Sequence, residues 1–469
     1  MTLTGREATG GEHVHFVGIG GAGMSAIAHV LLSKGVVVSG SDAVASEYTR
    51  KLTQAGATVY IGHDAKHVQG ADRVVYSTAL GSDNLELQAA RANRIPLLHR
   101  SEMLALLMQE GIGIAIAGAH GKTTTTSMVA YILSRAGLDP TFLVGGVVAN
   151  LQTGAHAGAG NLIVAEADES DGSFLNYRPQ IAVITNIEAD HLEHYGGDFA
   201  RLQEAYVRFA NLVPPSGLLV GCFDDVHVRT LSTAVSARVC TYSLQDAQAD
   251  LVADVRELTS HGSSSLVQLR GEPLGVLTLH VPGRHNVANA LAALAVALEA
   301  GVSFPVAALA LEEFRGALRR FQVVYEDAER NVTVIDDYAH HPTEIEATIA
   351  ALKEDGRRIV AVFQPQRYTR TFHLFEDFTK AFVQADEVII TSIYSPVGEQ
   401  PIAGVTGESL CAGVREQSNA KAHFCSTLQD VQAQLQVIVE PGDVVLTMGA
   451  GDIWKAGRGF ADWYRTQVG

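Results

Sequence analysis

One stretch decides the fold of the middle of the chain: Ile112-Gly113-Ile114-Ala115-Ile116-Ala117-Gly118-Ala119-His120-Gly121-Lys122-Thr123-Thr124-Thr125-Thr126. Its small and branched apolar beginning predicts a buried parallel strand. The pattern beyond the threonines predicts an amphipathic helix from Ser127 to Ala136, closed by Gly137. A strand, a glycine turn, Lys-Thr and a helix are together typical of polyphosphate sites, because backbone N–H groups and a helix N-terminus face the phosphate oxygens. We therefore predict an ATP site.

The four threonines are poor helix formers, so local propensity disfavours a helix start at Lys122. Phosphate and metal binding explain them better than packing does, since Thr123 can offer a hydroxyl to Mg²⁺. The spacing also departs from the common G-x-x-x-x-G-K-[ST] pattern. Ile116 occupies the first glycine position, and Gly118 and Gly121 carry the turn instead.

Composition limits the class of protein. The 469 residues correspond to about three domains, and an apolar content of 47% provides enough material for their cores. A formal net charge of −17 argues against a nucleic-acid binder. Scattered cysteines without a CxxC pair predict free thiols, and the polar segment Met1–Glu12 lacks an apolar signal region. We expect a cytoplasmic protein that binds neither nucleic acid nor membrane and is a monomer or weak dimer.

A second glycine-rich turn lies near the N-terminus, where the strand His13–Gly18 runs into Gly18-Ile19-Gly20-Gly21-Ala22-Gly23-Met24 and a helix. The next strand ends at Gly40-Ser41-Asp42, about 20 positions further on. This arrangement predicts a Rossmann-type dinucleotide or nucleoside diphosphate site, in which Asp42 could contact a ribose or a base. The glycines alone do not distinguish NAD from a UDP-sugar.

Polar residues collect after the strands of the central part. Lys122, Glu166 and His191 all follow predicted strands, so a parallel sheet would bring them to one edge. Glu166 suits Mg²⁺, whereas the next acidic residues, Asp168 to Asp171, are predicted to form a solvated loop. Residues after Val220 to about Ser265 predict a β-rich excursion.

Two asparagines open the alanine-rich helix that follows. Asn286 and Asn289 are three residues apart and share a helix face. They could read an adenine or simply cap the helix.

The last part of the chain repeats the pattern of polar residues after strands. Gly316–Gln322 predicts a hinge with paired cations, Arg319 and Arg320. A strand ending at Asp336-Asp337-Tyr338-Ala339-His340-His341 precedes a helix that begins at Pro342. Arg367 and Arg370 follow another strand and are suited to a carboxylate or phosphate.

Taken together and in this order, these motifs resemble the Mur ligase family over essentially the whole chain. The resemblance implies an α/β fold of three domains: a Rossmann-like UDP-sugar-binding domain (1–111), a central P-loop-type ATPase domain (112–317) and a Rossmann-like C-terminal domain that binds the amino acid and closes (318–469). It also implies an ATP- and Mg²⁺-dependent ligase in cytoplasmic peptidoglycan synthesis. Its substrates would be UDP-N-acetylmuramate and L-alanine, joined through an acyl phosphate.

The resemblance assigns roles residue by residue. Catalytic roles fall on Lys122, Glu166, His191 and Arg320, and metal binding on Thr123, Glu166 and His191. ATP would be bound by Gly118, Ala119, His120, Gly121, Lys122, Thr123, Thr124, Asn286, Asn289, Arg320 and Asp337. The UDP-sugar would be bound by Gly18, Gly20, Gly21, Ala22, Gly23, Met24, Ser41 and Asp42, and the amino acid by Tyr338, His340, Arg367 and Arg370.

Two positions depart from the family pattern: Ala119 replaces a frequent threonine, and Gln366 replaces a histidine before the arginine. A related ligase that adds a tripeptide is one alternative. A nicotinamide oxidoreductase and a partitioning ATPase that acts on a protein partner are two others. The sequence does not decide how strictly L-alanine is preferred over glycine or serine.

Overall fold

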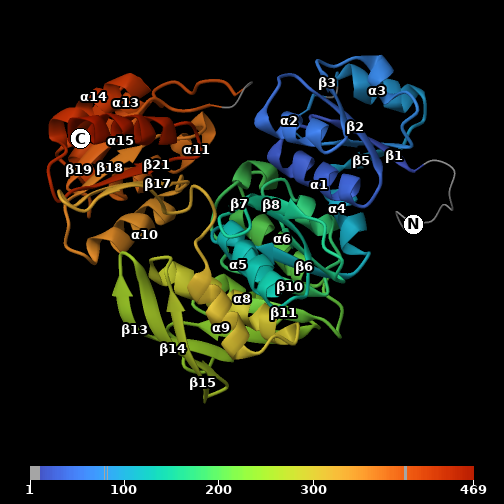
Figure 1. The fold of residues 1–469 in the computed structure, drawn as a ribbon, viewed down its shortest axis with the longest axis horizontal. Coiled ribbons are helices and arrows are strands. Elements are labelled where there is room, and N and C mark those ends of the chain that lie inside the picture. Colours follow the sequence, from blue (N-terminus) through green and yellow to red (C-terminus); the bar gives the residue numbers. More distant parts are fainter. Residues whose placement is uncertain (1–10, 79, 82, 396–398, 469) are drawn as a thin grey trace. The chain divides into compact units, whose positions relative to one another are not determined.

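The computed structural model describes residues 11–78, 80–81, 83–395 and 399–468, so most of the segment Met1–Glu12 lies outside the described residues. Within these ranges the strands form three mainly parallel sheets that alternate with helices along the chain (Figure 1). The predicted α/β class is confirmed. The chain divides into two compact units: unit 1 comprises Met1–Asp254, Leu266–Leu277 and Ala288–Phe314, and unit 2 comprises Val255–Ser265, Thr278–Val287 and Arg315–Gly469.

The first sheet has five parallel strands in the order β3-β2-β1-β4-β5. Its strands are β1 (His13–Val17), β2 (Val37–Asp42), β3 (Thr58–Ile61), β4 (Arg73–Tyr76) and β5 (Leu97–His99). The helical segments are α1 (Ala22–Ser33), α2 (Glu47–Gln54), η1 (Ala65–Val68), α3 (Leu85–Ala92) and α4 (Arg100–Met108). Phe16 on β1 packs in one apolar cluster with Ile27 of α1, and Val17 in another with Leu87 of α3, so apolar layers cover both faces.

The second sheet has the order β15-β14-β13-β12-β11-β10-β6-β9-β7-β8. Its strands are β6 (Ile112–Ala117), β7 (Thr141–Val148), β8 (Thr153–His156), β9 (Leu162–Glu166), β10 (Ile181–Ile184), β11 (Leu218–Cys222), β12 (Arg238–Ser243), β13 (Leu251–Thr259), β14 (Gly262–Leu269) and β15 (Glu272–Leu279). The helical segments are α5 (Lys122–Arg135), η2 (Ser173–Asn176), η3 (Leu192–Tyr195), α6 (Phe199–Ala210), α7 (Val226–Ser232), α8 (Arg284–Glu299) and α9 (Phe304–Glu313). The strand β6 lies between β10 and β9 and pairs parallel to both, which places the glycine turn after β6 between the ends of its neighbours.

The third sheet has the order β16-β17-β21-β18-β19-β20, with β16 antiparallel to β17. Its strands are β16 (Gln322–Asp327), β17 (Val332–Asp337), β18 (Ile359–Phe363), β19 (Glu387–Thr391), β20 (Ala422–Cys425) and β21 (Val444–Met448). The helices are α10 (Pro342–Lys353), α11 (Tyr368–His373), α12 (Phe375–Lys380), α13 (Gly407–Gln417), α14 (Leu428–Ile438) and α15 (Trp454–Val468). Along β18, Val362 packs with Phe460 of α15 while Phe363 packs with Phe378 of α12, so this sheet also carries helices on both faces.

Two predicted elements need correction. The helix predicted from Ser127 begins five residues earlier, at Lys122, because the left-handed Gly121 ends the turn there and Thr126 and Ser127 return their hydroxyls to the carbonyls of the preceding turn. The excursion after Val220 contains the helix α7, and its strands continue to Leu279.

Two further findings concern the cysteines and the apolar character of the helices. The four cysteines are free thiols, as predicted. None of the helices in the described ranges is long and apolar enough to cross a membrane.

Candidate functional site

The end of β2 holds the first glycine loop in shape. The N–H of Gly18 donates to the carbonyl of Ser41 at 2.8 Å, and the N–H of Gly20 donates to Asp42 Oδ2 at 2.8 Å. A side chain at Gly20 would not fit, because a Cβ there would lie 2.8 Å from the same carboxylate oxygen. Gly21 then precedes α1, so the open N–H groups of the first helical turn follow directly on the loop.

Two of the residues predicted to bind the UDP-sugar have buried side chains. Met24 is 3% exposed and packs in the apolar cluster of the first sheet. Ser41 is fully buried, and its hydroxyl contacts Glu86 and His63. The Met24 side chain and the Ser41 hydroxyl are therefore committed to the interior of the protein.

The second glycine loop, between β6 and α5, is fixed by residues that follow β10. The N–H of His120 donates to Asn186 Oδ1 at 2.8 Å, and Thr185 Oγ1 donates to the carbonyl of His120 at 2.6 Å. Gly118 and Gly121 both have positive φ, 138° and 82°. A Cβ at Gly118 would lie 1.9 Å from Thr185 Oγ1, so both glycines are required by the turn itself.

Lys122 and Thr123 begin α5 directly after this loop. The Lys122 ammonium donates to the two carboxylate oxygens of Glu169 at 2.8 and 2.9 Å and also contacts the carbonyl of Gly118. Thr123 Oγ1 lies 3.3 Å from Glu166 Oε2, at the end of β9. The other oxygen of Glu166 accepts the N–H of Gly145 at 2.7 Å. A hydroxyl and a carboxylate oxygen thus lie side by side at the start of α5.

The acidic loop after β9 differs at Glu169 from the solvated segment that the sequence predicted, while the Asp168 side chain is 38% exposed. Glu169 is 3% exposed because it pairs with Lys122, and Asp168 accepts a hydrogen bond from Arg100 at 3.0 Å. Burial would raise the pKa of Asp168, but the charges of Lys122 and Arg100 and hydrogen bonds from Ser170 lower it to about 2. Burial would lower the pKa of Lys122, and the carboxylates of Glu169 and Asp168 raise it instead.

The two asparagines of α8 have different surroundings. Asn286 donates from its side-chain amide to the carbonyl of Pro282 at 2.7 Å, as a residue that closes the preceding turn does. Asn289 Oδ1 accepts from Thr125 at 3.2 Å, and it lies 2.5 Å from where a Cβ of Gly121 would be. Asn289 therefore lies directly beside the second glycine loop.

His191 follows β10 in a left-handed conformation, with φ of 54°. Its ring lies 3.4 Å from Asp190 and 3.9 Å from Glu193. The imidazole thus faces carboxylates of its own loop.

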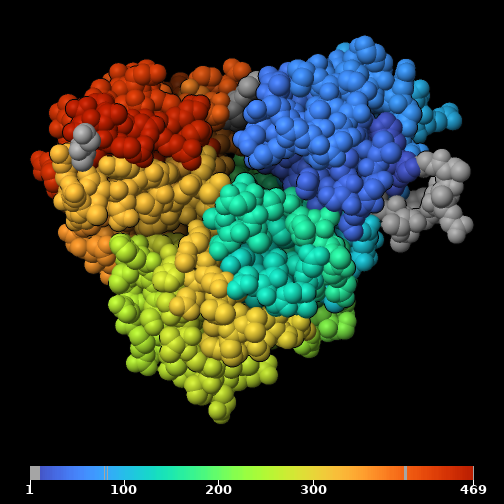
Figure 2. Space-filling model, in the orientation of Figure 1, coloured from blue at the N-terminus to red at the C-terminus, as the bar shows by residue number. Residues whose placement is uncertain are grey.

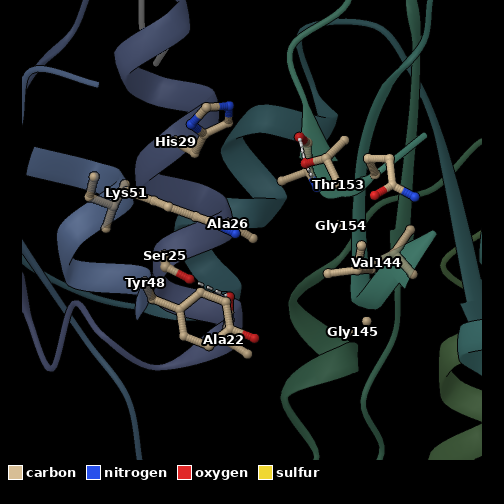
Figure 3. A pocket seen from close by; sticks show the side chains of 15 residues that line it. Ala22, Ser25, Ala26, His29, Tyr48, Lys51, Val144, Gly145, Thr153 and Gly154 are labelled. Carbon is tan, nitrogen blue, oxygen red and sulfur yellow. Dashed lines mark hydrogen bonds between the residues drawn. The ribbon is translucent and has the colours of Figure 1, made fainter. Parts of the chain in front are cut away.

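A cavity of about 270 Å³ lies between the first sheet's helices α1 and α2 and the strands β7 and β8 (Figure 3). Tyr48 and Lys51 of α2 stand on one side and Val144 and Thr153 on the other. The helix α1 contacts β7 and β8, and the space-filling view shows these segments as adjoining blue and turquoise surfaces (Figure 2). The cavity reaches Gly145, whose N–H holds Glu166.

Unit 2 places two of the predicted residues, Arg320 and His340, against a third, Tyr338. The guanidinium of Arg320 lies 5.0 Å from the centre of the Tyr338 ring, and His340 Nδ1 contacts the carbonyl of Tyr338 at 2.9 Å. Asp337 is occupied by backbone, since its two oxygens accept the N–H groups of Phe321 and Ala339 at 2.6 Å each. Burial raises the pKa of Asp337 to about 6 and lowers that of His340 to about 4.

Arg367 and Arg370 lie at the start of α11, directly after β18. Arg367 precedes the helix with φ of 66°, and Arg370 is 8% exposed and donates to Gln366 Oε1 at 3.1 Å. The positive charge of Arg370 contributes to the lowered pKa of His340. Gln366, the residue that departs from the family pattern, thus supports Arg370.

Comparison with known proteins gives three adjoining matches to one family. They are the Mur ligase family catalytic domain at residues 13–111, the Mur ligase middle domain at 116–297 and the Mur ligase glutamate ligase domain at 319–451. The chain belongs to the Mur ligase family.

Similar members and structures cover nearly the full length. A UDP-N-acetylmuramate–L-alanine ligase from Sorangium cellulosum is 50% identical over 96% of this chain and 95% of its own. One from Geotalea daltonii is 49% identical over 95% and 97%. The crystal structure of the UDP-N-acetylmuramate–alanine ligase from Thermotoga maritima matches with a TM-score of 0.80 at 32% identity, covering 97% of this chain and 99% of that one.

The predicted resemblance and the fold of three Mur ligase domains are therefore confirmed. The individual site residues and the exact domain boundaries stay predictions. The sequence did not identify Glu169 as the partner of Lys122 or Arg100 as the partner of Asp168 in this Mur ligase. It also did not identify Glu86 and His63, which contact Ser41. A local signal existed only for Glu169, which stands in the acidic run after a strand; the others are brought in from separate elements.

Proposed function

We propose that this Mur ligase joins L-alanine to the lactyl carboxylate of UDP-N-acetylmuramate, with ATP cleaved to ADP and phosphate. The observation that carries the proposal is the full-length identity of about half of all residues to ligases of that name. The second glycine loop supports it, because Lys122 stands at a helix start among backbone N–H groups, as a polyphosphate site requires.

A carboxylate does not acylate an amine at neutral pH, so it must first be activated. A lactyl oxygen attacks the γ-phosphorus, the bond to the bridging oxygen breaks, and an acyl phosphate and ADP form. Lys122 and Arg320 would balance the charge on the transferring phosphoryl group. The amine of L-alanine then attacks the acyl carbon and loses a proton, phosphate leaves, and the amide remains.

The residues present fit a magnesium ion. Thr123 Oγ1 and Glu166 Oε2 are 3.3 Å apart, and both are oxygen ligands of the kind that Mg²⁺ takes beside phosphates. Bound there, the ion would neutralise phosphate charge. His191 is proposed as a ligand for a second ion, which would require its ring to leave the carboxylates it now faces.

The substrates would enter from separate elements. The first glycine loop would hold the diphosphate of UDP, because its backbone N–H groups and the N-terminus of α1 suit an anion. The cavity of Figure 3 would take the sugar, since it extends from the first turn of α1 to the strand that holds Glu166. Asn289 would contact adenine, and Arg367 and Arg370 would hold the carboxylate of L-alanine. The cytoplasmic location and the absence of a membrane or nucleic-acid partner stay predictions.

One assay tests the function. Phosphate release is measured with ATP and Mg²⁺, with and without UDP-N-acetylmuramate and each of several amino acids. We expect release only when the sugar nucleotide and L-alanine are both present, and none from Lys122→Ala. Hydrolysis that needs neither substrate would instead indicate a partitioning ATPase. Oxidation of NADH or NADPH by the chain would indicate an oxidoreductase. Incorporation of a tripeptide in place of L-alanine would indicate the related ligase.

A further inference from the structure

A buried carboxylate organises the edge of the first sheet beside the first glycine loop. Glu86, in the first turn of α3, is fully buried. It accepts hydrogen bonds from Ser41 Oγ at 2.5 Å, His67 Nδ1 at 2.8 Å and the N–H of Asp64 at 3.2 Å. Burial alone would raise the pKa of Glu86, but the bonds from His15, Ser41, His67 and Asp64 lower it to about 2. Glu86 is therefore ionised.

The ionised carboxylate fixes the protons of its neighbours. A carboxylate only accepts hydrogen bonds, so the single O–H of Ser41 must point to Glu86. Ser41 Oγ can then only accept from His63 Nδ1, which lies 3.0 Å away and also faces Glu86 at 3.5 Å. In its neutral form the ring of His63 thus carries its proton on Nδ1. Its other nitrogen, Nε2, keeps a lone pair and acts as an acceptor.

His63 lies where a nucleoside would lie if the first glycine loop holds a diphosphate. The strands β2 and β3 run parallel with Asp42 opposite Ile61, and the N–H of Gly62 donates to the carbonyl of Asp42 at 2.8 Å. His63 follows Gly62 directly and is 24% exposed. Within the described ranges, His63 Nε2 has no hydrogen-bond partner. An acceptor thus stands at the carboxyl edge of β2 and β3, next to the loop.

We propose that His63 reads the base of the sugar nucleotide, its Nε2 accepting the N3–H of uracil, and that Ser41 and Glu86 are positioning residues that fix this tautomer. The proposal rests on the proposed function, which places UDP at this loop. Cytosine has a lone pair at N3 instead of a hydrogen. Two lone pairs would then face each other, and CDP would be rejected.

The test compares UDP and CDP binding to the full-length protein by calorimetry. We expect the wild type to prefer UDP by about 100-fold, as when one hydrogen-bonding group is left unpaired by the wrong ligand. Ser41→Ala removes the acceptor 3.0 Å from Nδ1 and leaves only the longer contact to Glu86, so the Nδ1–H form is held less firmly and the UDP/CDP preference should fall at least tenfold. Ser41→Thr keeps a hydroxyl and should restore the preference. Ser39→Ala is the matched control. Ser39 lies on β2 like Ser41, but its hydroxyl contacts His13 and His15 of β1 and not His63.

A second readout does not depend on the ligand. Nitrogen-15 NMR of the histidine rings should show the Nδ1–H form of His63 in the wild type, and a mixture of forms in Ser41→Ala and Glu86→Gln. A wild-type ring protonated on Nε2 would overturn the proposal.

The binding outcomes separate the inference from the function. A preference unchanged in Ser41→Ala, with UDP-dependent ligation intact, would overturn the inference alone. If 2′-deoxy-UDP bound as weakly as CDP, the inference would also be overturned, because the His63 ring would then recognise the ribose. A wild type that binds neither UDP nor CDP would overturn the inference and the proposed function together.

Discussion

The contact between Lys122 and Glu169 predicts that nucleotide binding must displace a buried carboxylate. In the structure the Lys122 ammonium is held by both oxygens of Glu169, at 2.8 and 2.9 Å, and Glu169 is 3% exposed. Removing one partner of a buried ion pair typically costs about 3–5 kcal/mol. In Glu169→Gln, the lysine keeps its contacts to the carbonyls of Gly118 and Ala119, and the amide oxygen keeps one bond. We therefore expect the substitution to remove about 2 kcal/mol of the pairing energy, which corresponds to roughly 30-fold in an equilibrium constant.

The lost pairing energy destabilises only the nucleotide-free state. In the bound state Lys122 would contact the ATP phosphates instead of Glu169. Glu169→Gln should therefore lower the thermal midpoint without nucleotide and bind ATP up to about 30-fold more tightly, as measured by calorimetry with Mg²⁺. Asp171→Asn is the control, since Asp171 lies in the same acidic loop but bonds Thr78 and Ser173. Unchanged or weaker ATP binding in Glu169→Gln, or an equal gain in Asp171→Asn, would refute the idea that Glu169 competes with the phosphates.

Two more predictions concern a buried acid and a glycine. The pKa of Asp337 is raised by burial to about 6, so its contribution to stability is complete below about pH 4 and is lost as the pH rises through 6. Hydrogen exchange can measure the free energy of unfolding of unit 2 in the wild type and in Asp337→Asn. The wild-type value minus the variant value should fall by about 3 kcal/mol from pH 4 to pH 7. A difference between the two proteins that does not change with pH would contradict this. Gly121→Ala should weaken ATP binding, because φ is 82° and a Cβ would meet Asn289 Oδ1 at 2.5 Å. Gly137→Ala, with φ of 75° and open space around its Cβ, should lower stability by about 1–2 kcal/mol while ATP binding is unchanged, and weakening by both variants alike would exclude the contact as the cause.

Strands and glycine turns were predictable because each depends on residues close in sequence. The strand β18 precedes Arg367 and the helix α10 begins at Pro342, as predicted, since a continuous apolar run and an N-terminal proline define these elements locally. The sequence predicts too late a start for α5, because the four threonines have low helix propensity whereas the left-handed Gly121 sets the start. The pairing of Glu169 with Lys122 joins residues 47 positions apart, and no local pattern distinguishes it from a solvated acidic loop.

The two glycine loops of unit 1 share one construction, and this changes how their neighbouring polar residues are interpreted. In the first loop, Asp42 at the end of the next strand binds the N–H of Gly20. In the second, Asn186 after the neighbouring strand β10 binds the N–H of His120. A glycine loop lacks side chains that could fix its own conformation, so the adjacent strand end must supply the acceptor. Asp42 therefore stabilises the loop, whether or not it also contacts a ribose. Its loss would disturb the conformation of the proposed diphosphate site and not only a single contact to the ligand.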